Sequence, residues 1–256
     1  MNETMTIIQQ RRSIRAYQDK AIERETVNQI VQAAMRAPTA GNMMLYSIIE
    51  IEEQAIKEKL AKSCDNQPFI ARAPLILVFL ADYQRWVDFF TASDVAGYCA
   101  ARGKELRLPG EGDLLLACCD ALIAAQTAVI AAESLGIGSC YIGDIMEQYE
   151  HHRELLDLPQ YVFPITLVCF GYPKTGEKQK LSPRFGQEYI HFKDRYERLD
   201  ETALKKMFAD REPEQYFGDA SNLGQHHYAR KFSQDFAIEM TRSVRAAIKA
   251  WTERRR

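Results

Sequence analysis

The longest apolar stretch of the chain covers residues 113–143 and predicts a long helix followed by a short extended segment. Residues 114–132 are apolar on almost every face, and a helix of this kind must be buried on all sides. Asp113 suits the N-cap, because its carboxylate can accept the unpaired N–H groups of the first turn. Gly136 suits the left-handed residue that follows many helices. We therefore expect a central helix that is buried in the core or in a subunit interface.

A membrane span is the alternative interpretation of this apolar helix. No basic residues flank the run, and it is interrupted by Asp120, Gln126, Thr127 and Glu133. An aspartate at the centre of a bilayer costs a few kcal/mol, so the pattern favours a helix inside a protein core. Asp120 then needs a polar partner in that core, and the sequence does not identify one.

The rest of the chain alternates between amphipathic helices and short apolar strands. Helical spacing of apolar residues predicts helices at 4–11, 21–36, 54–62, 82–90, 202–208 and 228–251. Short apolar runs predict strands at 46–51, 75–80, 161–170 and 189–192. Residues 97–112 contain several glycines and predict an excursion over a site or a partner subunit. Because helices outnumber strands, we expect an α+β fold in which helices wrap a small sheet.

The composition changes near Asp200, which divides the chain into two expected parts. Residues 1–200 would form the main domain, and residues 201–256 would form a C-terminal helical extension. Turn-forming residues at 213–224 precede the last helix, at 228–251, which carries a long apolar stripe. A lone helix of this kind has no core of its own, so it must dock. It could pack on its own subunit or embrace the partner subunit, and our hypothesis is the embrace.

Composition and charge indicate a globular protein with no evident anionic partner. The chain has 256 residues, of which 46% are hydrophobic, enough for a sizeable core. Lys and Arg total 33 against 35 Asp and Glu, which gives no general reason to expect nucleic acid or an anionic membrane. The six cysteines show no zinc-binding spacing, and residues 1–10 contain no apolar signal-peptide core. We therefore expect a reduced, cytoplasmic protein without a metal site.

Two polar segments carry candidate chemistry. Residues 11–15 place three guanidinium groups and a hydroxyl within five positions, and arginine forks match phosphate oxygens. The alternative is a solvated basic helix end, which the helix dipole favours. Residues 39–42 form a turn that could connect a helix to a strand or present Asn42 to a heterocycle. The histidines adjoin no nucleophile pattern and are expected to be structural or solvated; they are His151, His152, His191, His226 and His227.

Four separated motifs, in this order, resemble the signatures of the FMN-dependent nitroreductase family. They are Arg-Arg-Ser-Ile-Arg at 11–15, Ala-Pro-Thr-Ala-Gly-Asn at 37–42, Gly-Ile-Gly-Ser-Cys-Tyr-Ile-Gly at 136–143, and Gly-Tyr-Pro at 171–173 with Pro-Arg at 183–184. The resemblance covers residues 11–192, so residues 200–256 lie outside it. It implies a nitroreductase-like fold with a small mixed or antiparallel sheet, and a homodimer that holds FMN between its subunits.

The resemblance also implies which residues hold the cofactor. For the phosphate and ribityl chain these are Arg11, Ser13, Arg15 and Arg184, with Arg12 beside them. For the ring or the ribityl chain these are also Pro38, Thr39 and Asn42. For the ring these are Gln67 at the polar edge, Tyr141 and Ile142 over one face, and a backbone N–H near Gly143 at the flavin N5. Related proteins often have Lys two positions before the C-terminal Arg, where this chain has Ser182. Lys180 could substitute, which leaves the phosphate set open.

The implied activity is hydride transfer from NADH or NADPH to FMN and then, in a ping-pong sequence, to an electron-poor small molecule such as a nitroaromatic or a quinone. Because the flavin carries this chemistry, we expect no catalytic side chain. The sequence has no Gly-x-Gly-x-x-Gly fingerprint from which NADH and NADPH could be told apart. The alternatives are a flavin-consuming or dehalogenating enzyme of the same fold, and a non-catalytic flavin-binding protein.

Overall fold

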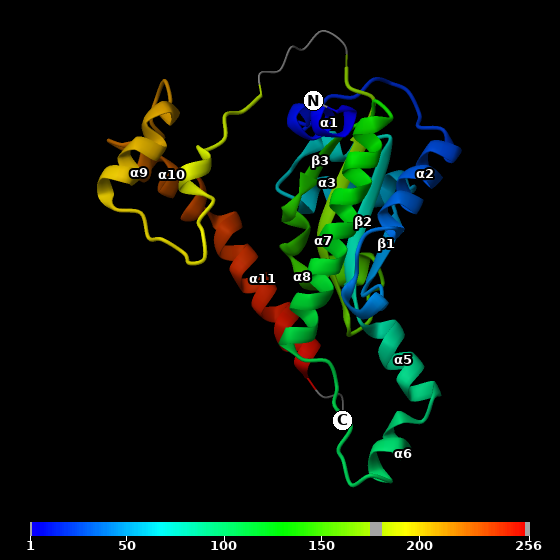
Figure 1. Cartoon of the computed structure of the whole chain (residues 1–256). Helices are drawn as coiled ribbons and strands as arrows, with labels where there is room; N and C mark the ends of the chain where they lie inside the picture. Colours follow the sequence, from blue (N-terminus) through cyan, green and yellow to red (C-terminus); the bar gives the residue numbers. More distant parts are fainter. Residues whose placement is uncertain (1, 175–180, 254–256) are drawn as a thin grey trace. The chain divides into compact units, whose positions relative to one another are not determined.

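The structure is a computed structural model that describes residues 2–174 and 181–253. These residues form two compact units, whose elements are labelled in Figure 1. The first unit contains residues 2–174 together with 239–253, and the second contains residues 181–238. The last helix therefore begins in the second unit and ends in the first.

A four-stranded antiparallel sheet with strand order β1-β2-β4-β3 forms the centre of the first unit. Its strands are β1 (Tyr46–Glu50), β2 (Leu75–Asp82), β3 (Gly138–Ile142) and β4 (Val162–Gly171). Every residue of β2 is buried, as a continuous apolar run predicts for a central strand. The pairing of β2 with β4 shifts register between Phe79 and Leu80. The α+β class and the small antiparallel sheet are confirmed.

The long helix α7 (Glu111–Ser134) lies along one face of this sheet, and α2 (Arg24–Met35) packs beside it (Figure 1). Its inward face consists of small side chains that allow close approach to the sheet: Ala117, Ala121, Ala124, Ala125, Ala128, Val129 and Ala132. Its outward face is equally apolar but exposed, with Leu115 at 68%, Leu116 at 44%, Leu122 at 42% and Ile123 at 41%. Within a single chain, α7 is therefore buried on one face rather than on all sides.

The ends of α7 agree with the sequence prediction only in part. The helix begins at Glu111, so Asp113 occupies the third helical position and is not the N-cap. Its carboxylate reaches back to accept a hydrogen bond from the Gly110 N–H at 2.8 Å and also pairs with Arg107. Gly136 adopts a φ of +72°, as predicted. Among the helices of residues 2–174 and 181–253, α7 alone is long and apolar enough to cross a membrane, and half of its most apolar window is buried inside the chain.

A second group of helices covers the opposite face of the sheet. It consists of α3 (Gln54–Ser63), α4 (Pro68–Ala71), the short 3-10 helix η2 (Gly143–Met146) and α8 (Tyr149–Leu155). Leu60, Ile70 and Ile145 from these elements are fully buried against the sheet. The remaining N-terminal helix, α1 (Glu3–Gln10), contacts α7. The sheet thus has one apolar core on each face.

An arm of two helices projects away from the sheet (Figure 1). It consists of α5 (Gln84–Ala92) and α6 (Val95–Ala100), followed by residues 104–110 without helix or strand. Trp86 fixes its base by donating from Nε1 to the Met43 carbonyl at 2.9 Å. The predicted excursion at 97–112 is the outer half of this arm.

The second unit is built from short helices with few buried residues. They are η3 (Gln187–Tyr189), α9 (Glu201–Phe208), η4 (Ala209–Arg211), α10 (Leu223–His227) and the π-helix η5 (Tyr228–Phe232). Of its described residues, 181–238, only Leu223 and His226 are buried. The strand predicted at 189–192 is wrong, because a 3-10 turn ending at Tyr189 stands in its place and no strand pairs with it.

The helix predicted at 228–251 is divided into two. After η5 the chain turns at Ser233 and Gln234, and α11 (Asp235–Thr252) follows. From Glu239 onward α11 belongs to the first unit, where Ala247 and Trp251 are buried. This part of the helix therefore packs on its own subunit.

Candidate functional site

Residues 11–15 leave α1 and run beside β3 as an irregular extra strand. Ser13 forms a parallel bridge with Ser139, and the Ile14 N–H donates to the Ser139 carbonyl at 2.8 Å. Tyr17 then forms an antiparallel bridge with Pro173. The structure thus brings the arginine segment together with the motifs at 136–143 and 171–173.

Gly138 makes this close approach possible. A Cβ atom at Gly138 would lie 2.5 Å from the side chain of Ile14, a distance that real Cβ contacts do not show. Any larger residue would therefore push the arginine segment away from β3. This glycine serves the packing of residues 11–15.

The arginine segment is a cationic cluster opposed by the carboxyl group of Glu133 on α7. Burial raises the pKa of Glu133, and the nearby guanidinium groups of Arg11 and Arg12 counteract that rise. The Arg12 Nε is buried and has no hydrogen-bond partner in the described part of the chain. A buried donor without a partner costs about 1–3 kcal/mol. The cluster has an excess of positive charge and a spare donor, and both suit an anion.

Ser13 and Arg15 lie at the buried thiol of Cys140. Burial raises the pKa of this thiol, and the charge of Arg15 and a hydrogen bond with Ser13 lower it. The Arg15 guanidinium also lies 5.9 Å from the centre of the Phe69 ring and is exposed to solvent. Arg15 therefore forms the solvent-facing end of the cationic cluster.

The loop between α2 and β1 is held by the buried carboxylate of Asp120 on α7. Asp120 accepts hydrogen bonds from the Thr39 hydroxyl, from the Ala40 N–H at 3.0 Å and from the Leu45 N–H at 3.2 Å. The Thr39 hydroxyl oxygen in turn accepts from the Met44 N–H at 2.8 Å. This network supplies the partner that Asp120 requires, and sequence reasoning did not find it. The only sequence signal was an acidic residue isolated in an apolar helix.

The predicted ring contacts in this loop differ in what they can offer a ligand. The Thr39 hydroxyl donates its one hydrogen to Asp120 and accepts from the Met44 N–H, so it has no hydrogen left to donate to a cofactor. Asn42, at the end of the short 3-10 turn η1 (Ala40–Asn42), is exposed, and so is Pro38, just before this turn. Gly41 and Asn42 both have positive φ, 56° and 57°, which curls the loop tightly. The Thr39 side chain could therefore only accept a hydrogen bond from a ring and could not donate one.

Gln67 joins the helices of the second face to the start of η2. Its Nε2 donates to the Cys64 carbonyl at 3.0 Å and to the Asp144 carboxylate at 2.8 Å. Asp144 directly follows Gly143, which is exposed at the end of β3. Two of the predicted ring contacts, Gln67 and Gly143, are therefore tied to the same short turn.

Tyr141 and Ile142 lie on opposite faces of the sheet, as neighbours in a strand must. Tyr141 packs on the α7 side, where its hydroxyl donates to the Gln126 side chain at 3.2 Å. Ile142 is 2% exposed and packs on the α3 side. The two side chains therefore point to different faces of the sheet, and the covering of a ring face by this segment stays a prediction. Burial also raises the pKa of Tyr141 to about 12, so its hydroxyl stays protonated.

The C-terminal part of the predicted phosphate set belongs to the second unit. Arg184 and Ser182 are both exposed there, and Lys180 lies outside the described residues. The grouping of Arg184 with Arg11 and Arg15 stays a prediction.

The buried histidines have structural partners. His152 is fully buried, with its Nδ1 at 2.8 Å from the Ile145 carbonyl and its Nε2 at 2.7 Å from the Ser63 hydroxyl. Because a carbonyl only accepts, Nδ1 carries the proton; burial lowers the pKa of His152 and keeps the ring neutral. His226 accepts from the Phe217 N–H at 2.9 Å. Within residues 2–174 and 181–253, no group of three metal-ligating side chains is found.

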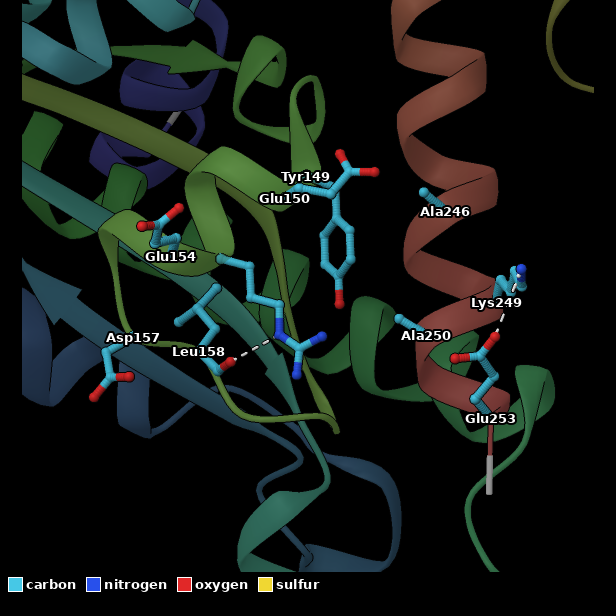
Figure 2. A pocket seen from close by; sticks show the side chains of 10 residues that line it. Tyr149, Glu150, Glu154, Asp157, Leu158, Ala246, Lys249, Ala250 and Glu253 are labelled. Carbon is cyan, nitrogen blue, oxygen red and sulfur yellow. Dashed lines mark hydrogen bonds and ion pairs between the residues drawn. The ribbon is translucent and has the colours of Figure 1, made fainter. Parts of the chain in front are cut away.

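A separate groove of about 580 Å³ lies between α8 and α11 (Figure 2). Arg153 donates from Nε to the Leu158 carbonyl at 3.1 Å, and Lys249 pairs with Glu253 at 3.6 Å. None of the predicted site residues lines this groove. It is therefore distinct from the cationic segment beside β3.

Comparisons with known proteins agree on one family. The sequence pattern of the Nitroreductase family matches residues 8–172. A Bacillus subtilis (strain 168) protein, named as an FMN reductase that uses NAD(P)H, is 31% identical over 237 residues, which cover 93% of this chain and 90% of that protein. A Staphylococcus epidermidis protein, named NADPH-dependent oxidoreductase, is 30% identical over 220 residues, covering 84% of this chain and 83% of that protein. The solved structure of NfrA2 from B. megaterium is 30% identical, with a TM-score of 0.79 and 98% of each chain covered.

Proposed function

This chain belongs to the nitroreductase family, and we propose that it is an NAD(P)H-dependent oxidoreductase that uses FMN as its cofactor. The names of the two curated relatives support the cofactor and the electron donor. The observation in this structure that carries the proposal is the cationic segment beside β3. Its buried Arg12 Nε lacks a partner in the described chain, and a phosphate oxygen would supply one.

Residues 11–15 would bind the phosphate end of FMN. Arg11, Arg12 and Arg15 provide three guanidinium groups, and Ser13 adds a compact hydroxyl donor. The carboxyl group of Glu133 opposes only part of this charge, so the segment still favours a dianion. Arg184 would complete the set, which rests on the family motif alone.

Two exposed turns, the loop before β1 and the turn after β3, would position the ring. Asn42 and Pro38 would approach it from the loop after α2, while Gln67 and Gly143 would approach it from the turn at η2. FMN held there would supply the hydride and electron-transfer chemistry between a nicotinamide and an acceptor. The nicotinamide and an electron-poor nitroaromatic or quinone would occupy the same site in turn, in a ping-pong sequence. The residues of this chain would bind and orient these partners, and none is proposed as a nucleophile or general base.

The protein would act as a homodimer, with the cofactor site at the interface. The outward face of α7 exposes Leu115, Leu116, Leu122 and Ile123 at adjacent helical positions. A contiguous exposed apolar stripe of this kind marks an interaction surface. A second copy of the chain would cover it and remove the apolar side chains from water.

Two further points belong to the proposal. The protein would lie in the reducing cytoplasm. The free cysteines of the described chain are consistent with that location. The choice between NADH and NADPH and the physiological acceptor stay open. The alternative activities are a flavin-consuming or dehalogenating reaction, or flavin binding without turnover.

The deciding experiment is anaerobic reduction of the FMN-loaded protein by NADH and by NADPH, followed through the flavin absorbance. Bleaching by either nicotinamide, and return of the colour on adding a nitroaromatic or a quinone, would establish the proposed activity and its acceptor class. Protein that binds FMN but is bleached by neither nicotinamide would be a binder or a different enzyme. Protein that takes up no FMN would refute the proposal.

A further inference from the structure

The Pro-Arg motif at 183–184 lies in a segment that has little backbone structure of its own. Residues 181–186 form neither helix nor strand, and Arg184 is exposed. In the described chain, the Pro183 carbonyl is the only backbone group of residues 181–185 that takes part in a hydrogen bond. The position of Arg184 therefore depends on side-chain contacts made by its neighbours.

One side chain contacts the residues on both sides of Arg184. Arg211, the last residue of η4, donates from Nη2 to the Pro183 carbonyl at 2.9 Å. The same guanidinium group lies over the ring of Phe185, 3.7 Å from its centre. Because Pro183 and Phe185 directly flank Arg184, Arg211 holds the chain immediately before and after it.

The ring of Phe185 has a second aromatic neighbour. It packs nearly perpendicular to the ring of Phe208, with 5.1 Å between the ring centres. Phe208 is the last residue of α9, a helix whose N-cap Asp200 accepts from the Ala203 N–H at 2.8 Å. The segment that carries the Pro-Arg motif is thus attached, through Phe208 and Arg211, to a regular helix of the same unit.

The guanidinium group of Arg184 stays available to an anion. Neither Arg184 nor Arg211 takes part in an ion pair within residues 2–174 and 181–253. Arg211 uses neutral partners instead, since it donates to a carbonyl and lies over a ring. Positive charge without an acidic partner favours a phosphate beside Arg184.

We infer that Arg211 is a positioning residue, which holds Arg184 in the conformation that binds the FMN phosphate. The inference rests on the proposed function, because it needs the phosphate contact that the family motif assigns to Arg184. A guanidinium group suits this role, since it can stack on a ring and donate in its own plane at the same time. Ordering Arg184 in advance lowers the conformational entropy that is lost when the phosphate binds.

The test measures the binding of two flavins, FMN and riboflavin, which lacks the phosphate, to the full chain. Arg211→Ala should weaken FMN binding about tenfold, the scale of one charge-assisted hydrogen bond, and leave riboflavin binding unchanged. Titration of flavin fluorescence gives both dissociation constants. If Arg211→Ala weakens the two flavins equally, Arg211 has only a structural role and the inference is wrong.

Phe185→Leu distinguishes positioning from charge. It removes the ring under Arg211 but no charge, so FMN should bind about two- to fivefold more weakly, the worth of an exposed cation–π contact, with riboflavin unchanged. If Arg211 acts only through its charge, Phe185→Leu will bind FMN as the wild type does, which contradicts the inference. Arg230→Ala is the matched control: it removes an exposed arginine of the same unit and should keep both affinities.

A double-mutant cycle shows whether Arg211 acts through Arg184. Arg184→Ala should weaken FMN binding about tenfold or more. The double variant should bind FMN within about twofold of Arg184→Ala alone, because Arg211 then has no guanidinium group to position. If the two losses multiply in the double variant, Arg211 contributes independently of Arg184 and the inference is overturned.

The outcomes separate the inference from the proposed function. If Arg184→Ala lowers the preference for FMN over riboflavin but Arg211→Ala and Phe185→Leu do not, the inference fails and the proposed function stands. If Arg184→Ala leaves FMN affinity unchanged, the inference fails with the assignment of Arg184, and bleaching by NADH or NADPH still decides the proposed function. If the wild-type protein takes up no FMN, the proposed function fails and the inference with it.

Discussion

The side-chain hydroxyl of Thr39 donates a hydrogen bond to the carboxylate of Asp120, 81 positions further along the chain. Asp120 lies on α7 and accepts two further bonds from the backbone of the same loop, at Ala40 and Leu45. A residue that the motif assigns to the cofactor thus has its hydroxyl turned inward. The loop is held by α7 through Thr39, Ala40 and Leu45, while Pro38 and Asn42 are exposed.

Replacing Asp120 with alanine should destabilise the protein by about 2–4 kcal/mol, because the buried N–H groups of Ala40 and Leu45 would lose their acceptor. Urea denaturation measures the change. Asp88→Ala is the control, since this exposed carboxylate should alter stability by less than about 0.5 kcal/mol. Wild-type stability in Asp120→Ala would mean that the loop holds its shape without the carboxylate.

Gly138→Ala should displace the arginine segment, because the added methyl would meet Ile14 at 2.5 Å. Overpacking of this kind costs about 1–3 kcal/mol, and FMN affinity should fall with it. Gly112→Ala is the matched control, since no atom lies within 4 Å of its added Cβ. At this position in the first turn of α7, alanine should be neutral or stabilising by up to about 1 kcal/mol. If Gly138→Ala and Gly112→Ala had the same stability and the same FMN affinity, Gly138 would not have the packing role described here.

The guanidinium cluster should govern FMN affinity. Arg11→Ala and Arg15→Ala should each weaken binding by about 1.5–3 kcal/mol, the scale of a charge-assisted hydrogen bond. Titration of flavin fluorescence provides the measurement. Arg36→Ala, an exposed arginine at the end of α2, should leave affinity unchanged. The phosphate assignment is wrong if both cluster variants bind FMN as the wild type does.

A carboxylate on the outward face of α7 should break the proposed dimer. Leu122→Glu or Ile123→Glu would replace a side chain worth about 1.5–3 kcal/mol of burial with a charge, twice in a symmetric interface. Analytical ultracentrifugation should show monomers with wild-type circular dichroism. Ser134→Glu, at the exposed end of α7, should remain dimeric. A wild-type monomer in light scattering that binds FMN fully would contradict the homodimer itself.

Variants at Trp251 and Phe232 distinguish packing of the C-terminal helices on their own subunit from packing on the partner subunit. Trp251 is 1% exposed and packs edge-on against Tyr161, so Trp251→Ala should cost about 3–5 kcal/mol of stability. Phe232 is 77% exposed, so Phe232→Glu should leave stability within about 0.5 kcal/mol but raise the dimer dissociation constant. Unchanged dimerisation in Phe232→Glu would refute the embrace. Truncation after Glu212 would remove both side chains and could not separate these effects.

The parts of the fold that follow from local pattern were predictable. β2 and α7 are continuous apolar segments, and burial explains all of β2 and the inward face of α7. The break before α11 was not predictable from apolar spacing. There the Ser233 N–H and hydroxyl both bond to the Tyr228 carbonyl, so a local polar interaction competes with the regular helix.

The site was predictable as a set of segments rather than as a set of contacts. The opposite orientation of Tyr141 and Ile142 follows from the period of a strand, which the family pattern does not express. The partners of Gln67 and Asp120 could not be read from the sequence. The contact of Gln67 with Asp144 and that of Asp120 with Thr39 each join residues more than 70 positions apart, and only the packed fold brings them together.

Helix α7 sets the distance between the two ends of the proposed site. Asp120 holds the loop after α2, and Glu133 faces the arginine segment, so the helical rise separates these two anchor points by about 20 Å. The outward face of the same helix carries the proposed contact with the second subunit. Formation of the dimer and binding of FMN would then be thermodynamically linked through α7. Occupancy by FMN should therefore depend on protein concentration, and diluted protein should release its flavin as its dimers come apart.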